Sequence, residues 1–499
     1  MVLIKRILNS FVFWGAWILI PILMEVVPAI GSFVLLIRRR IKRRIKLNKL
    51  TFFPDISLII PVYNSADTLR ACIKSVNDSS YPSDKIRIFL VNNQGKDDSF
   101  SIFAQCQGEF PQLRMQWLNA KQGKSRALNL ALYNSEGKYI INLDSDGVLE
   151  KHALENMVTK FEQKENLNCM TGAILTTPKD IEKYKGFISK VFRRLEFYEY
   201  AQAFLAGRSY ASEINSVYTL SGAFSAFRKS TILKSRLYNT DTICEDTQLT
   251  FQMRYIYKER VEVCEDAIFM VDPIESVNKL YTQRQRWQRG SLEVGKMFMD
   301  KNFRLRKMFA DVNVKTLIYD HTFAFPRLIW YIALLCLLFM NYSGTVIVYS
   351  TILIFLLYIV MGYAYFAAAQ HFMKDMPDIR RYYLRHCGCV ILLPFFNLVV
   401  FFIRLAGIIN SIGTDSAWKT KTLSDEREDF TNCIKEEMTT PLSYIMKFRK
   451  WVNNESTDKK NGKDNIDDTD NTDNTDNTDS TDNIDRTVNR EEDIIEEKA

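Results

Sequence analysis

Two aspartates directly follow residues 139–143, a short apolar run with the length of a buried strand. Asp144 and Asp146 are spaced i, i+2, so at a strand end both carboxylates can reach one hard cation. A Mg²⁺ or Mn²⁺ ion held by few protein ligands keeps coordination sites free for phosphates and stabilises a departing nucleoside diphosphate. Because an Asp-x-Asp on a surface turn is common, the pair predicts a metal site only together with other motifs.

A lysine and an acidic pair supply further reactive groups. Lys124 starts a helical stretch, where an anionic phosphate can meet its ammonium and free backbone N–H groups; a solvated lysine is the alternative. Glu245 and Asp246 precede another helical stretch, and a carboxylate there can act as general base on an acceptor hydroxyl. Alternatively, Asp246 caps that helix and Glu245 adds favourable charge near its start.

A third cluster contains Gln283, Arg286 and Trp287. The indole offers a stacking face for a sugar ring, and the guanidinium can pair bidentately with a phosphate. The cluster is equally compatible with a basic amphipathic helix at a membrane surface, in which Trp287 is an interfacial anchor. Both interpretations stay open at this point.

These residues need a scaffold, and residues 51–275 alternate strand-like with helix-like segments. The clearest strands are 56–62, 86–91 and 139–143, and the clearest helices are 67–76 and 124–132. Such alternation predicts an α/β domain with a mainly parallel, covered sheet. Ligands bind at the carboxyl ends of parallel strands, which is where the polar clusters fall.

Four apolar runs flank this domain, at 11–37, 322–340, 345–368 and 387–409. A bilayer core of roughly 30 Å needs about 20 such residues, so each run is long enough to span. A signal peptide is the alternative for the first, but no small-residue cleavage site follows it. The basic run 38–46 then places the domain in the cytoplasm. Its position beside a span disfavours nucleic-acid binding.

The last apolar run leaves the topology open. Three full spans after the domain would place everything beyond 410 outside the cell, whereas a re-entrant or interfacial 387–409 would keep the tail inside. Arg404 is costly at a bilayer centre, so we expect it to snorkel or to face a polar interior.

Composition narrows the function classes. The 499 residues carry a net charge of +8, with four histidines and nine scattered cysteines. No cysteine spacing suggests a zinc or iron–sulfur site, and reduced thiols fit a cytoplasmic domain. Thr-Asp-Asn near-repeats after about 455 predict a disordered acidic tail.

In order along the chain, the motifs resemble glycosyltransferase family 2, in the membrane-bound processive branch with cellulose, hyaluronan and poly-N-acetylglucosamine synthases. The resemblance covers roughly 52 to 290. Its motifs are Ile60-Pro61-Val62-Tyr63-Asn64, Gly123-Lys124 with Ala127-Leu128-Asn129, Asp144-Ser145-Asp146, Ser221-Gly222-Ala223-Phe224, Glu245-Asp246 and Gln283-x-x-Arg286-Trp287.

The resemblance implies a GT-A nucleotide-sugar-binding fold flanked by transmembrane helices, and inverting transfer from a UDP-sugar. On this basis Asp144 and Asp146 hold the diphosphate through Mg²⁺ or Mn²⁺, and Asp246 is the catalytic base. The nucleotide-sugar site would comprise Pro61, Tyr63, Asn64, Asn92, Asn93, Lys124 and Asp144. The acceptor and diphosphate would contact Glu245, Gln283, Arg286 and Trp287. Trp418-Lys419-Thr420 resembles the segment that covers the nucleotide in such synthases.

One departure concerns the nucleotide. The family usually has an aspartate followed by Gly-Ser after the second strand, whereas this chain has Asn92, Asn93 and Gln94. An asparagine can still hydrogen-bond a uracil edge, but we expect no carboxylate in that corner.

The expected organisation is a multi-pass protein of the cell membrane with a cytoplasmic catalytic domain. It comprises a transmembrane segment and basic run (1–50), the GT-A domain (51–275), interfacial helices (276–320), a transmembrane region (321–410), a gating or amphipathic segment (411–454) and the tail (455–499). Expected partners are a UDP-sugar, a glycan or lipid-linked acceptor, membrane lipid and an accessory membrane subunit.

Three functions compete. The first is a processive polysaccharide synthase. The second, suggested by the small number of spans, is a non-processive transferase that adds one sugar to a lipid-linked acceptor. The third is a catalytically silent membrane protein that binds a nucleotide or glycan, suggested only by the altered Asn92–Asn93 corner.

Overall fold

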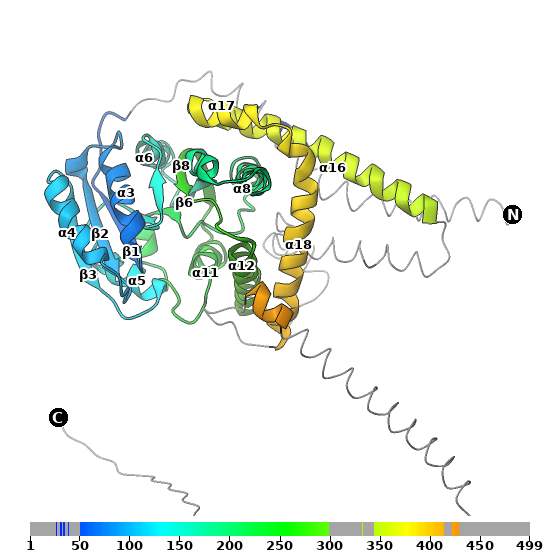
Figure 1. The fold of residues 1–499 in the computed structure, drawn as a ribbon. Helices are drawn as coiled ribbons and strands as arrows, with labels where there is room; N and C mark the ends of the chain where they lie inside the picture. Colours follow the sequence, from blue (N-terminus) through cyan, green and yellow to red (C-terminus); the bar gives the residue numbers. More distant parts are fainter. Residues whose placement is uncertain are drawn as a thin grey trace, which may run out of the picture. The chain divides into compact units, whose positions relative to one another are not determined.

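The computed structural model describes residues 50–298, 344–413 and 422–428, together with residues 26, 30–31, 33–34, 38 and 332. One eight-stranded sheet, in the order β3-β2-β1-β4-β7-β6-β8-β5, forms its centre (Figure 1). Its strands are β1 (Ile56–Val62), β2 (Ile86–Asn92), β3 (Arg114–Asn119), β4 (Tyr139–Leu143), β5 (Gly147–Leu149), β6 (Cys169–Thr176), β7 (Phe224–Arg228) and β8 (Val261–Val271).

The sheet is mixed but mostly parallel, as expected, and its antiparallel pairs lie in its second half. Strands β3, β2, β1 and β4 run parallel, whereas β7 is antiparallel to both β4 and β6. The chain first builds outward from β1 through β2 to β3 and then returns to β4 on the other side of β1. Such a reversal leaves a crevice at the carboxyl ends of β1 and β4, where ligands bind in sheets of this kind.

Helices cover both faces of the sheet because alternate strand residues point to opposite sides. Leu58 and Ile60 of β1 pack into a core shared with α3 (Ala66–Asn77), α4 (Ser99–Glu109) and α6 (Ala153–Gln163). Ile59 instead belongs to a second core with α5 (Lys124–Asn134). The buried β-branched run that predicts β1 therefore serves two cores at once.

The domain contains further helices. They are α7 (Pro178–Lys183), α8 (Phe187–Tyr200), the π-helix η3 (Ala201–Gly207), α9 (Arg208–Glu213), α10 (Lys229–Ile232), α11 (Glu245–Phe251), the π-helix η4 (Gln252–Ile256) and α12 (Val277–Phe298), with a short 3₁₀ turn η2 at Ser83–Lys85. The helical stretch expected after Asp246 is thus an α-helix that begins earlier, at Glu245, and continues into a π-helix.

Two described helices are long and apolar enough to cross a membrane, over 347–372 and 389–410. They belong to α16 (Gly344–Phe372) and α18 (Cys389–Gly413), which the short amphipathic α17 (Pro377–Arg385) connects. They coincide with two of the four apolar runs. The other two, 11–37 and 322–340, lie almost entirely outside the described residues, as do the tail and Trp418-Lys419-Thr420.

Helix α18 lies along the catalytic domain, beside α8 and α12 (Figure 1). Near its start, Phe396 contacts Phe192 of α8 with ring centroids 5.8 Å apart. Near its end, Asn410 donates a 2.7 Å hydrogen bond to Glu426, which also accepts a hydrogen bond from Tyr281 of α12. Both ends of α18, and the chain that follows it, therefore contact α8 or α12.

Candidate active site

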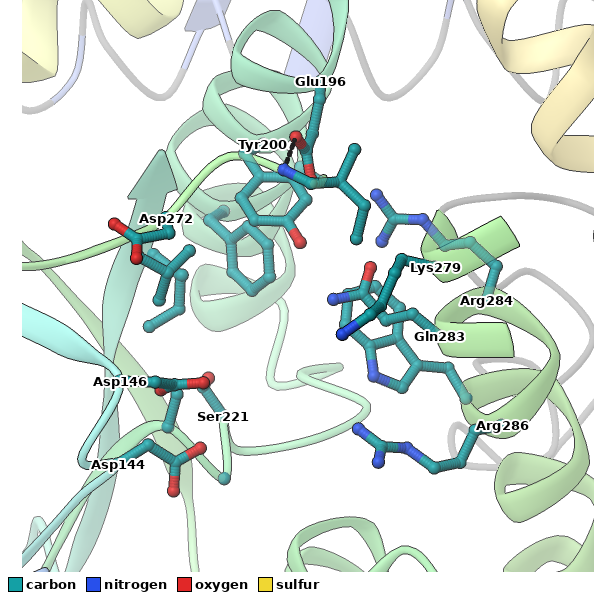
Figure 2. A pocket seen from close by; sticks show the side chains of 18 of the residues that line it. Asp144, Asp146, Glu196, Tyr200, Ser221, Asp272, Lys279, Gln283, Arg284 and Arg286 are labelled. Atoms are coloured by element: carbon teal, nitrogen blue, oxygen red, sulfur yellow. Dashed lines mark hydrogen bonds between the residues drawn. The ribbon is translucent and has the colours of Figure 1, made fainter. Parts of the chain in front are cut away.

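A cavity of ≈ 800 Å³ opens at the carboxyl edge of β4, between that strand and helices α8, α11 and α12 (Figure 2). Figure 2 shows Asp144 and Asp146 on one wall and Gln283 and Arg286 on the opposite wall. The predicted residues that line it are Lys124, Asp144, Asp146, Glu245, Asp246, Gln283, Arg286 and Trp287. Segments that lie far apart in the sequence, from Lys124 to Trp287, thus converge on one cavity.

The two aspartates project from the end of β4, and Lys124 at the start of α5 faces them. Lys124 Nζ lies 2.5 Å from Asp144 Oδ1. Burial lowers the pKa of Lys124, but the charges of Asp144 and Glu245 outweigh it, so the ammonium form is favoured. Burial, reinforced by the charge of Asp144, raises the pKa of Asp146 to about 6. The aspartate pair is therefore an electrostatically crowded site.

This aspartate pair fits a divalent cation. The mutual repulsion that raises the pKa of Asp146 is what a bound cation relieves. Among the described residues, no group of three or more histidine, cysteine or acidic side chains could hold a metal ion. Two carboxylates alone suit Mg²⁺ or Mn²⁺ whose other ligands are water and substrate phosphate.

Asp246 is oriented by backbone donors. Its Oδ2 accepts the N–H of Gly222 at 2.9 Å, and its Oδ1 accepts the N–H of Thr247 at 2.6 Å. The N-cap of α11 is Cys244, so Asp246 occupies the first turn of the helix and the N-cap alternative is wrong. With both oxygens held, the carboxylate keeps further lone pairs for an acceptor hydroxyl.

Glu245 precedes this carboxylate and is 7% exposed. Its Oε1 lies 3.8 Å from Lys124 Nζ. Burial raises the pKa of Glu245, and the nearby ammonium opposes that rise. Glu245 therefore faces Lys124, in addition to lining the cavity.

Helix α12 presents Gln283, Arg286 and Trp287 on one side, as the spacings i, i+3 and i+4 require. Trp287 lines the cavity, which favours the substrate-stacking interpretation over an anchor in lipid. The cation of Arg284 lies 4.4 Å from the centre of the Trp287 ring. Arg284 is 2% exposed and pairs with Glu199 of α8 at 2.6 Å.

Arg404 of α18 is also buried and lines the same cavity, where it donates to Gln288 at 3.5 Å. It thus faces a polar interior, one of its two expected placements. Sequence reasoning missed the part played by Arg284 and Glu199. Arg284 lies inside the recognised motif, but nothing near Glu199 in the sequence marks it as its partner.

The remaining predicted residues lie beside the cavity. Pro61 is part of β1, and Tyr63 follows it with a half-exposed ring. Three asparagine oxygens are each held by a backbone N–H: Asn64 by Lys96 at 2.9 Å, Asn92 by Gly95 at 3.0 Å and Asn93 by Gly123 at 2.6 Å. A backbone N–H can only donate, so in each side chain the amide oxygen faces that N–H. The NH₂ group of each asparagine therefore points away from it.

The NH₂ of Asn92 is engaged as well, because it donates to Asn119 at 3.1 Å. The expectation that no carboxylate lies in this corner needs correction. Asp97 lies there and accepts the N–H of Ala66 at 2.7 Å and the hydroxyl of Ser99 at 2.7 Å. The Asp97 carboxylate therefore accepts hydrogen bonds at the starts of α3 and α4, and these bonds stabilise the local fold.

The sequence is similar to those of known proteins. Residues 57–259 match the model of the family described as glycosyl transferase family 2. A poly-beta-1,6-N-acetyl-D-glucosamine synthase of Staphylococcus epidermidis is 24% identical over 55% of this chain and 64% of its own length. The synthase of the same name from Staphylococcus aureus strain MSSA476 is 25% identical over 56% of this chain and 66% of its own.

Among solved structures, a mannosyltransferase from Pyrobaculum calidifontis, in complex with GDP-Man and Mn²⁺, is 18% identical with a TM-score of 0.48. The alignment covers 72% of this chain and 99% of that one.

The matches to the two curated synthases named above span just under two thirds of the length of those synthases.

Proposed function

We propose that this protein extends a polysaccharide from a UDP-sugar. The proposal starts from residues 57–259, which belong to glycosyltransferase family 2 and form a GT-A-like α/β domain. One observation carries the proposal: Asp144, Asp246 and Trp287 line a single cavity. That cavity thereby unites a diphosphate site, a general base and a sugar-stacking surface, which are the three parts that glycosyl transfer requires.

At the donor end, Asp144 and Asp146 would hold the divalent cation, which neutralises charge on the diphosphate leaving group. Lys124 lies 2.5 Å from Asp144 and contributes a second positive charge to the same region. Arg286 on the facing wall reaches the cavity with a planar guanidinium suited to phosphate oxygens. The leaving diphosphate is thus bound from two sides.

At the acceptor end, Asp246 takes the proton from the attacking hydroxyl. The N–H groups of Gly222 and Thr247 orient its carboxylate before substrate binds. Trp287 stacks on the acceptor ring, while Gln283 beside it offers hydrogen-bonding groups. Direct attack by an acceptor activated in this way is a single displacement, which inverts the anomeric configuration.

The membrane elements support synthesis at the cytoplasmic face of a cell membrane. Helix α16 is long enough to span, and α18 lies along the catalytic domain with both ends in contact with it. If α18 does not cross the membrane, the described segment 422–428 lies on the same side of the membrane as the catalytic domain. The names of the relatives make UDP-N-acetylglucosamine the first donor to test.

The test is to incubate membranes containing the full chain with radiolabelled UDP-sugars and Mn²⁺ or Mg²⁺, and to size the product. We expect high-molecular-weight product from one donor, and its loss in Asp246→Asn. Asp241→Asn, exposed on the loop that precedes α11, is the matched control and should retain activity. A short glycolipid would show single addition to a lipid-linked acceptor. Undiminished turnover in Asp246→Asn would remove the proposed base.

A further inference from the structure

Lys124 lies between two carboxylates that come from different elements. Its Nζ is 2.5 Å from Asp144 Oδ1, at the end of β4, and 3.8 Å from Glu245 Oε1, at the start of α11. The carbonyl oxygen of Gly222 is 3.4 Å away. The lysine side chain is 20% exposed. One ammonium group therefore has a bonded carboxylate and a second carboxylate just beyond bonding distance.

We infer that Lys124 exchanges partners when a divalent cation binds: it pairs with Asp144 in the empty site and with Glu245 once the cation occupies Asp144 and Asp146. Glu245 is then a positioning residue for Lys124. This inference rests on the proposed use of the two aspartates as cation ligands, and it assigns Glu245 a role other than direct contact with the acceptor.

The exchange needs little movement. Charge-assisted N–H···O bonds have donor–acceptor distances near 2.8 Å, so a shift of about 1 Å closes the gap between Lys124 and Glu245. Nζ has three protons, and the Gly222 carbonyl remains a neighbour in both positions. A cation on Asp144 repels the ammonium group, which supplies the force for this displacement.

The burial of Glu245 explains why a second acceptor is present. A carboxylate that is 7% exposed is unfavourable without a cation nearby, and Lys124 lies within 4 Å of it. Without Glu245, a displaced Lys124 would lose this second carboxylate partner, and cation binding would become less favourable. Glu245 thereby lowers the cost of loading the site, and it keeps Lys124 near the position of the diphosphate.

The test measures Mn²⁺ binding to the full-length protein in detergent, without nucleotide or acceptor, from the electron paramagnetic resonance signal of free Mn²⁺. We expect Glu245→Gln to weaken Mn²⁺ binding by about tenfold, the value of one charge-assisted hydrogen bond. Lys124→Met removes the competing ammonium and should tighten binding by a similar factor. Glu293→Gln, which removes a carboxylate bonded to Thr242 and not to Lys124, should change nothing.

The double variant separates partner exchange from simple attraction between Glu245 and the metal. If Glu245 acts through Lys124, the Glu245→Gln effect disappears in the Lys124→Met background. A tenfold loss that persists there would overturn the inference. Thermal unfolding without metal checks that each variant is folded.

Glu245→Asp gives a test that keeps Lys124 in place. It retains the charge but withdraws the carboxylate from Lys124 by about one bond length, so we expect weakening close to that of Glu245→Gln. Binding equal to that of the wild type would contradict the inference. Neither result depends on sugar transfer, so an inactive protein with the expected Mn²⁺ pattern would refute only the proposed function.

Discussion

Gly290 of α12 packs directly against Cys244, the residue that precedes the Glu245–Asp246 pair. A β-carbon on Gly290 would lie 2.0 Å from Cys244 Sγ and 2.8 Å from its Cβ. The helix that carries Arg286 and Trp287 therefore packs against the segment that leads into Asp246, with no room for a side chain at Gly290. The proposed acceptor surface and the proposed base share this contact.

Gly290→Ala is expected to push α12 away from this segment. Overpacking of this kind costs about 1–3 kcal/mol of stability, and we expect a larger fall in kcat than in donor affinity, since Asp246 and Trp287 separate. Thermal unfolding and initial-rate kinetics measure the two effects. Gly108→Ala in α4 is the control, because a β-carbon there meets nothing within 4 Å. An active, fully stable Gly290→Ala protein would refute the contact's importance.

Glu199→Gln should destabilise the protein because it removes the carboxylate that pairs with the buried Arg284 guanidinium at 2.6 Å. Breaking a buried pair from one side costs about 3–5 kcal/mol, and the lost position of Arg284 over Trp287 should raise KM for the acceptor. The exposed Arg70–Glu109 pair has the same 2.6 Å separation. Glu109→Gln should therefore leave the unfolding temperature unchanged, and equal losses in both variants would contradict the argument.

The sequence predicts those parts of the fold and the site that a short, continuous segment determines. Strands β1, β2 and β4 follow from continuous buried runs, and α5 from its helical pattern. Strand β3 was missed because it lies at the sheet edge, where its residues alternate between exposed and half-buried and form no apolar run.

Long-range pairs could not be predicted at all. Arg284 and Glu199 are separated by 85 residues, and only the tertiary fold brings the two side chains together. The placement of α18 along the domain likewise depends on a surface that no single segment reveals. By contrast, the eight cavity residues were recognised because each belongs to a short motif whose order along the chain is informative.

Asn93→Asp should change nucleotide selectivity. The oxygen of Asn93 is held by the Gly123 N–H, so its NH₂ is the group available to a base. An NH₂ donates equally to a uracil carbonyl or to cytosine N3, whereas a carboxylate accepts from uracil N3–H and repels cytosine N3. We expect the variant to shift the UDP-to-CDP affinity ratio toward UDP by about tenfold, as measured by calorimetry.

Asn92→Asp is the matched control for that shift. Both polar ends of Asn92 already bond within the protein, to Gly95 and to Asn119. Its replacement should lower stability through loss of the Asn119 bond and leave the UDP-to-CDP ratio unchanged. A ratio that responds to Asn92 rather than to Asn93 would show that the base lies against a different part of the corner.

The affinity of the site for Mn²⁺ should depend on pH through Asp146. Burial and the charge of Asp144 raise its pKa from 3.8 to about 6, so the fold favours the protonated acid, and this stabilising contribution is lost as pH rises through about 6. A cation binds only the carboxylate. Mn²⁺ affinity, measured without nucleotide, should therefore fall about tenfold per pH unit below 6 and level off above it.

Glu196→Gln is the control for this pH profile. Burial raises the pKa of Glu196 to about 7, but this residue lies across the cavity on α8, so the profile should persist in the variant. A flat profile between pH 5 and 7, or one centred near 7 that this variant abolishes, would show that Asp146 does not control cation binding.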